Sequence, residues 1–159
     1  MGEDKKRVWD RIKNQYTCRL GECPDEITVR ELLNKQFETV KGIPGNTVAE
    51  TVRTLIMHPS LLLEVTATPE WKAEVRTQCL SLIAETTELL ETTPWKPWRK
   101  AHTEGRMTEE QVQDAKLEVV DQLCFMLNLF MLLGGNGQEL ALLHQVKCEE
   151  NLRRQKEAY

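Results

Sequence analysis

The sequence predicts an all-α protein, folded as a helical bundle of about five helices. Apolar residues recur with the three-to-four-residue spacing of a helix face in several segments. Two strong helix-start signals precede the longest of them: Thr68-Pro69, an N-cap hydroxyl followed by proline, and Thr108-x-x-Gln111, a capping box. No segment shows the strict apolar–polar alternation of a half-buried strand. These observations together exclude a sheet-based fold.

Each helix is bounded by a local signal. The first segment follows Pro24-Asp25, and glycines and a proline in 42–46 end it. Pro59 ends the second helix before a short helical turn, and the glycine-rich segment 134–137 separates the last two helices. The expected helices are 27–40, 47–57, 69–91, 109–133 and 138–155, with the turn at 61–65.

Length and composition indicate one ordinary globular domain, residues 1–159, in which 1–24 is polar and irregular. Apolar residues make up 40% and charged residues 29% of the chain. The formal net charge of −4 argues against a general nucleic-acid binder, which needs surplus cations to neutralise phosphates. A small anion remains a possible ligand if metal ions supply the positive charge.

The expected location is the cytoplasm. The charged N-terminus has no apolar core of a signal peptide. The longest apolar run, 123–133, is too short to span a bilayer. The count of five cysteines is odd, which favours free thiols in a reducing compartment.

An acidic pair on each of two predicted helices is the main candidate for chemistry. Glu85 and Glu88 form the first pair, and Glu118 and Asp121 the second. Residues three apart share one helix face, so each pair presents two carboxylates together. Apolar residues surround the second pair, which predicts a buried helix in which carboxylates are costly unless they bind metal. Four converging carboxylates would suit Mg²⁺, which prefers oxygen ligands.

The alternative is that all four carboxylates are solvent-exposed helix charges. For Glu88 this alternative is strong, because Glu91 repeats the same spacing. For Asp121 it is weak, because its neighbours leave little solvent-facing surface. From spacing alone, neither interpretation is preferred.

Two further segments are candidates for substrate contact. The loop Trp95-Lys96-Pro97-Trp98-Arg99-Lys100 could cover a base or sugar and pair with phosphates. Its alternative, better supported by composition, is a loop anchored by two tryptophans in the core. In the last helix, Lys147, Asn151 and Arg154 share one face and could contact phosphate and base. The alternative, better supported by the residues alone, is a solvated face with Glu149 and Glu150 as partners.

The acidic pairs resemble the metal motif of the all-α nucleoside triphosphate pyrophosphohydrolases, which include the dimeric dUTPases, the dCTPases and the MazG proteins. Within this superfamily the chain is similar to the dCTPase-dUTPases of T-even bacteriophages. Three segments carry the similarity: PWKPWRK (94–100), LEVVDQLCFMLNLF (117–130) and KCEENLRRQKEAY (147–159). It extends weakly to 31–40, where Gln36 matches a family glutamine, and the short, divergent N-terminal half departs from the family pattern.

The resemblance implies a fold, a reaction and a set of site residues. It implies a homodimeric bundle with two or more Mg²⁺ ions, or Mn²⁺, held by the four carboxylates. The metals would bridge the phosphates and acidify a water, which Glu85 or Glu88 would orient or deprotonate for attack on the α-phosphorus. The expected substrate is dUTP or dCTP, cleaved to the monophosphate and pyrophosphate, in the host cytoplasm if the chain is phage-encoded. The substrate-binding candidates are Gln36, Trp95, Lys96, Trp98, Lys100, Asn128, Lys147, Asn151, Arg154 and Tyr159.

Two other functions remain open at this point. One is a pyrophosphohydrolase for another deoxynucleotide, such as a purine. The other is a catalytically silent helical adaptor that keeps the fold. No contact with nucleic acid or membrane is expected. The base preference, the number of metals and the identity of the general base are not determined by the sequence.

Overall fold

The computed structural model describes residues 28–100 and 105–157, and these form a set of helices with no strand among them. The all-α prediction is therefore confirmed. The predicted irregular segment 1–24 and the C-terminal Tyr159 lie outside the described residues. The helices are α2 (Val29–Lys41), α3 (Thr47–Met57), the 3-10 turn η1 (Pro59–Leu61), α4 (Leu62–Ala67), α5 (Pro69–Thr92), α7 (Glu109–Leu132) and α8 (Gly137–Glu157).

Local capping fixes where most of these helices begin. The hydroxyl of Thr68 accepts a hydrogen bond from the amide of Trp71, and Pro69 occupies the first turn of α5. Thr108 and Gln111 form the predicted capping box at the start of α7. A second box, between Thr28 and Glu31, starts α2. The sequence analysis placed the opening of this segment at Pro24-Asp25 and did not use the Thr28 box.

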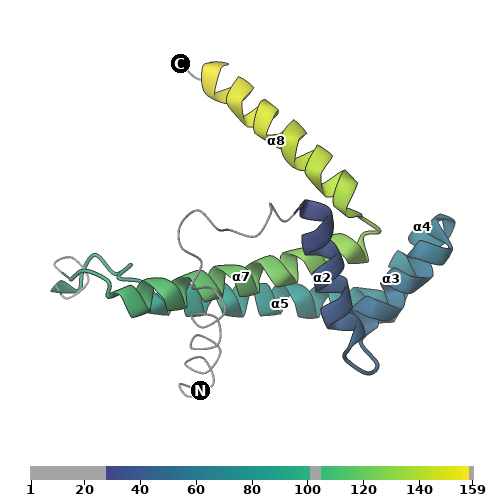
Figure 1. Cartoon of the computed structure of the whole chain (residues 1–159), viewed down its shortest axis with the longest axis horizontal. Helices are drawn as coiled ribbons and strands as arrows, with labels where there is room; N and C mark the ends of the chain where they lie inside the picture. Colours follow the sequence, from purple (N-terminus) through teal and green to yellow (C-terminus); the bar gives the residue numbers. More distant parts are fainter. Residues whose placement is uncertain (1–27, 101–104, 158–159) are drawn as a thin grey trace.

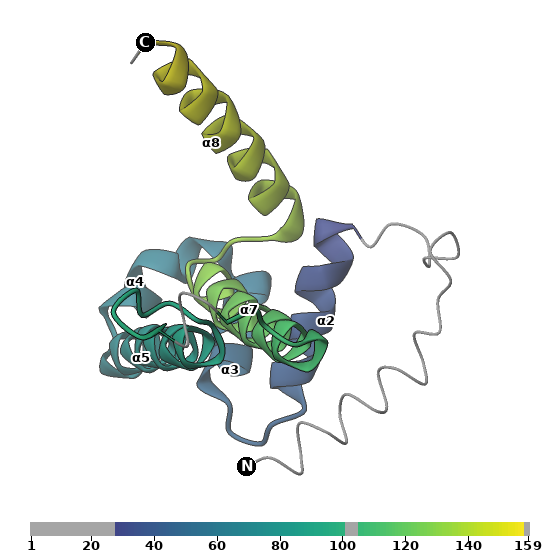
Figure 2. The same ribbon diagram turned by 90° about the vertical axis from the view of Figure 1, so that its left-hand side faces the viewer.

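The centre of the molecule is the long helix pair α5 and α7, which lie side by side and run in opposite directions (Figure 1). Helix α2 crosses this pair near the end that lies farthest from the loop between α5 and α7 (Figures 1 and 2). Helix α3 also packs against both long helices. The buried core lies where α2, α3 and α7 meet, and it consists of Leu33, Val40, Val48, Ala49, Val52, Leu127, Met131 and Leu132.

Helix α7 ends in a Schellman motif. The amide of Gly135 donates to the carbonyl of Phe130, and the amide of Gly134 donates to that of Met131. Gly134 has a φ of 77°, in the left-handed region that suits glycine. The indole of Trp71 donates to the carbonyl of Leu132 at 2.8 Å. A side chain of α5 thus bonds one of the last carbonyls of α7, which have no partner within their own helix.

Helix α8 projects away from the rest of the described chain (Figures 1 and 2). It contacts α2 near its first residue, Gly137, where an added Cβ would lie 2.6 Å from the Cα of Arg30. A side chain at this position would therefore push the two helices apart. The remainder of α8 leaves large apolar side chains exposed: Leu142, Leu143, Val146 and Leu152.

The prediction that α7 is buried nearly all round is wrong for the single chain. Val119 and Val120 are 53% and 51% exposed, and Met126 is also exposed. The physical reason is that α5 covers one side of this part of α7, whereas α2 and α3 meet it closer to its C-terminal end. In α3, Ile56 is likewise exposed, while Val52 of the same helix is buried.

Among the described residues no single helix is both long and apolar enough to cross a membrane. Helices α7 and α8 satisfy the length and composition requirement only when taken together, and they are bent by 108° at their junction.

Candidate active site

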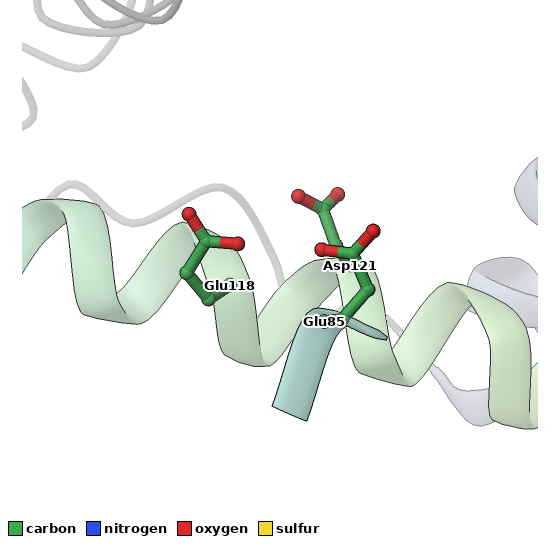
Figure 3. A group of neighbouring side chains, drawn as sticks. All are labelled: Glu85, Glu118 and Asp121. Carbon is green, nitrogen blue, oxygen red and sulfur yellow. The ribbon is translucent and has the colours of Figure 1, made fainter. Parts of the chain in front are cut away.

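Three carboxylates from the two long helices converge on one side of the α5–α7 pair. Glu85 comes from α5, and Glu118 and Asp121 come from successive turns of α7 (Figure 3). One oxygen from each residue can be chosen so that all three lie within 4.8 Å of one another. We call these three residues the acidic triad. The structure therefore brings together one carboxylate of the first predicted pair with both of the second.

The triad residues differ in exposure. Glu118 is only 1% exposed, Glu85 is half-buried and Asp121 is exposed. Little solvent-facing surface is expected at Asp121 from its apolar neighbours, and this prediction is wrong because Asp121 is left uncovered in the single chain. Burial of an ionised carboxylate costs free energy that must be recovered by pairing, hydrogen bonding or a bound cation.

Mutual repulsion within the triad shows in the electrostatics of Glu85. Partial burial raises the pKa of the Glu85 carboxyl, and the neighbouring charges of Asp121, Glu88 and Glu118 raise that pKa further. A positive ion placed between the carboxylate oxygens would offset the repulsion among these charges. Carboxylate oxygens are also the ligands that a hard divalent cation such as Mg²⁺ takes. The donor set therefore fits the implied metal.

Glu88 stands apart from the other three predicted ligands. It is half-buried, and it lies outside the set whose oxygens approach within 4.8 Å. It is still close enough to Glu85 for its charge to raise the pKa of that group. Glu88 thus borders the acidic triad without belonging to it.

A second cluster consists of side-chain amides that join α2, α7 and α5. The amide Nε2 of Gln36 donates to Oδ1 of Asn128 at 2.9 Å, and Nδ2 of Asn128 donates to Oε1 of Gln78 at 3.0 Å. Nε2 of Gln78 in turn donates to Oε1 of Glu74 at 2.6 Å. We call this chain of four residues the amide relay. The structure thus brings together Gln36 and Asn128, two predicted substrate-binding residues.

Gln78 and Glu74 are not among the site residues predicted from the sequence. Gln78 precedes Glu85 by seven residues, and Asn128 follows Asp121 by seven. Seven residues are close to two helical turns, so each amide lies on the same helix face as its carboxylate. That repeated spacing is the signal that could have identified Gln78. The relay and the acidic triad therefore occupy neighbouring stretches of the same facing sides of α5 and α7.

The tryptophan loop is not anchored in the core. Trp95 and Trp98 are 42% and 70% exposed, which contradicts the core-anchor alternative. Their rings pack edge to face with centroids 5.6 Å apart, and the ammonium of Lys96 lies 5.1 Å from the Trp95 ring centroid. The loop begins directly after α5, about two turns beyond Glu85. Lys100 lies at the end of this stretch, on the described side of the gap at 101–104.

The predicted contacts of the last helix lie away from the acidic triad within one chain. Lys147, Asn151 and Arg154 are exposed on the projecting part of α8 (Figure 1). The guanidinium of Arg154 donates to Glu150 at 2.8 Å on the same helix. Glu150 also pairs with Arg153 at 2.9 Å. The single chain therefore does not bring this helix face to the carboxylates.

Two apolar hollows lie outside the acidic triad. One, of about 350 Å³, lies between α2, α3 and the 134–137 connection, with Phe37 and Met131 in its lining. The other, of about 500 Å³, lies beside the exposed Val119 and Val120. Neither has a triad carboxylate in its lining, so neither by itself suggests chemistry. The acidic triad is the candidate site, because converging carboxylates can hold a metal ion and transfer protons.

The chain is similar to phage dCTP pyrophosphatases. It is 36% identical to the dCTP pyrophosphatase of Enterobacteria phage LZ5 over 41% of each chain. It is 26% identical to the dCTP pyrophosphatase of Enterobacteria phage T4 over 94% of this chain and 92% of the relative. The first match thus spans less than half of the relative's length, and the second nearly all of it. No family model and no solved structure matches the chain.

Proposed function

We propose that the protein is a Mg²⁺-dependent deoxynucleoside triphosphate pyrophosphohydrolase that converts dCTP or dUTP and water to the monophosphate and pyrophosphate. The observation that carries the proposal is the acidic triad, in which three carboxylates from two antiparallel helices come within 4.8 Å. The similarity to two proteins named dCTP pyrophosphatase supports the same reaction.

Each group of site residues has a role in this proposal. Glu85, Glu88, Glu118 and Asp121 would hold the metal, which when bound supplies positive charge to the phosphates and acidifies water. Glu85 or Glu88 would orient the attacking water or accept its proton. The water oxygen bonds to the α-phosphorus while the bond to the bridging oxygen breaks, and pyrophosphate leaves.

The order of features along the α5–α7 pair supports an extended nucleotide. The amide relay, the acidic triad and the tryptophan loop follow one another at intervals of about two turns, or roughly 10 Å each. A nucleotide whose α-phosphate lay at the triad would place its base toward the relay. The β- and γ-phosphates would then extend toward Lys96 and Lys100, which can neutralise their charge.

The products test this proposal directly. Incubation with dCTP, dUTP and purine deoxynucleotides in Mg²⁺, without added pyrophosphatase, should give monophosphate and pyrophosphate from the pyrimidine substrates. Ion chromatography distinguishes pyrophosphate from orthophosphate. Orthophosphate as the first product would refute attack at the α-phosphorus. Faster cleavage of a purine substrate would favour the purine alternative, and no hydrolysis with no Mg²⁺-dependent rise in melting temperature would favour a silent adaptor.

We further propose that the working unit is a homodimer. Large apolar side chains are exposed on α8 and, at Val119, Val120 and Met126, on α7. Extensive exposed apolar surface on a small protein is typical of a protein–protein interface. A second copy would cover it and would also provide a site within reach of the α8 residues Lys147, Asn151 and Arg154, which lie away from the triad of their own chain.

Light scattering at micromolar concentration should give about twice the chain mass of 18.4 kDa. Val146→Arg places a charge among the exposed apolar residues of α8 and should shift the mass toward that of a monomer, because the charge would be desolvated in the interface. Gln145→Arg adds the same charge one residue earlier, where Gln145 bonds Glu149, and should leave the dimer intact. A monomeric wild-type chain would contradict the proposal.

A further inference from the structure

The amide relay has a fixed direction, and its direction determines what it offers to a ligand. An ionised carboxylate only accepts hydrogen bonds, whereas an amide group donates from nitrogen and accepts at oxygen. Glu74 therefore requires Gln78 to present its Nε2 amide group, which donates to Glu74 at 2.6 Å. Once that bond is made, the Oε1 atom of Gln78 faces Asn128.

The same constraint passes to the next two side chains. Because Oε1 of Gln78 accepts, Asn128 must turn Nδ2 toward it and keep Oδ1 for Gln36. Gln36 then donates from Nε2 to that oxygen at 2.9 Å. Rotating any one of these amide groups by 180° would place two acceptors or two donors against each other. That is costly here, because Gln78 and Asn128 are only 7% and 5% exposed and water cannot replace the lost hydrogen bonds. One carboxylate thus fixes the orientation of three amides.

Gln36 is the amide end of the relay. Gln36 and Glu74, the two ends, are half-buried, whereas Gln78 and Asn128 between them are buried. With Nε2 of Gln36 bound to Asn128, no described residue donates to its Oε1, and the second hydrogen of Nε2 is left for a ligand. The Gln36 amide can therefore offer a ligand an acceptor beside a donor.

We propose that Glu74, acting through Gln78 and Asn128, sets Gln36 to select a base with an amino group beside an unprotonated ring nitrogen, and so favours dCTP over dUTP. This inference rests on the proposed function, because it names the base that the site takes. The amino group of cytosine donates to Oε1 while its ring N3 accepts from Nε2. Uracil presents the opposite pattern, an oxygen beside a ring N–H, and would meet Gln36 acceptor to acceptor and donor to donor.

An unconstrained glutamine would not make this distinction. Its amide can rotate by 180° and match either base, because both orientations satisfy the same two hydrogen bonds. Discrimination therefore depends on the carboxylate at the far end of the relay. Sites built to bond a polar group reject the mismatched analogue strongly, since buried polar atoms are left without partners. Glu74 is in this sense a positioning residue: it bonds Gln78 and acts on the ligand only through the relay.

The test is Glu74→Gln, which keeps the size of the side chain but allows it to donate as well as accept. The relay can then run in either direction, so the ratio of kcat/KM for dCTP to that for dUTP should fall by about tenfold or more toward one. The change should come from KM, which falls for dUTP and rises for dCTP. Glu70→Gln removes the same charge from an exposed position one turn earlier on α5 and should leave the ratio unchanged.

The same comparison by calorimetry with dCMP and dUMP measures base choice without catalysis. Tighter binding of dCMP by the wild-type protein, with loss of that preference in Glu74→Gln, supports the relay. Hydrolysis of dCTP and dUTP at equal kcat/KM would overturn the inference while leaving the proposed function intact. Preferential dCMP binding without hydrolysis of any nucleotide would refute the proposed function but support base selection. An unchanged preference in a folded Glu74→Gln variant would overturn the role of Glu74.

Discussion

Asp121→Asn is expected to lower kcat/KM by about three orders of magnitude or more while leaving the fold intact. Asp121 supplies one of the three carboxylates within 4.8 Å, and a bound metal contributes several kcal/mol to the stabilisation of a phosphoryl transition state. Each loss of about 1.4 kcal/mol lowers the rate tenfold. Asparagine keeps the size of the side chain but removes the charge that attracts the cation.

The stability of the metal-free variant provides an independent check. The charge of Asp121 is one of the causes that raise the pKa of Glu85, so at neutral pH the two ionised groups repel each other in the folded protein. Removing that repulsion should leave the melting temperature unchanged or higher. The Mg²⁺-dependent rise in melting temperature should be lost in the variant, because ligand binding to the folded state is its source.

A matched control separates the site from general charge effects. Glu110→Gln removes one negative charge from the exposed first turn of the same helix, α7, and should retain both activity and the Mg²⁺ response. Full activity in a folded Asp121→Asn variant would show that the acidic triad is not the metal site.

The double variant Lys147→Ala with Arg154→Ala is expected to lower kcat/KM by about two orders of magnitude or more, mainly through a higher KM. The expectation rests on the proposed dimer, in which this face of α8 would reach the substrate bound by the second copy. Hydrogen bonds to charged groups contribute roughly 1.5–3 kcal/mol each, so the loss of two phosphate contacts is large. Positioning contributes to kcat as well, so a smaller decrease in kcat should accompany the change.

The fold should survive this substitution. Both residues are exposed, and the Arg154–Glu150 pair is a surface ion pair that contributes little to stability. Alanine also favours helix, so helix propensity does not explain a defect. Arg153→Ala is the matched control, because Arg153 bonds both Glu150 and Glu157 and its loss removes more ion pairs than that of Arg154. A defect equal to that of the Arg153 control would show that this face of α8 is a solvated surface.

The helices themselves could be predicted from the sequence because their boundaries depend on neighbouring residues. Thr68 and Thr108 bond amides three residues away, and Pro69 and the glycines after α7 act within one turn. Helix α3 occupies the predicted 47–57. Such interactions join residues that are near neighbours in the sequence, so the local pattern alone specifies them.

The sequence also identified the four acidic residues, since residues three apart on a helix must share a face. It could not decide which of them meet. Glu85 and Asp121 approach one another because α5 and α7 run antiparallel at one register, and the tertiary structure buries Glu118 while it leaves Asp121 exposed. The exposure of Val119 and Val120 likewise depends on which helices cover this part of α7 in one chain.

The amide relay was decided by the tertiary structure alone. Gln36 and Asn128 are 92 residues apart in the sequence, and Asn128 and Gln78 are 50 apart. The seven-residue spacing from a carboxylate marks Gln78 and Asn128 one at a time, but no sequence pattern shows that these two amides and Gln36 bond one another. Only the packing of α2 and α5 against α7 brings the three amides and Glu74 within hydrogen-bonding distance. The direction of the relay then follows from the chemistry of its one carboxylate.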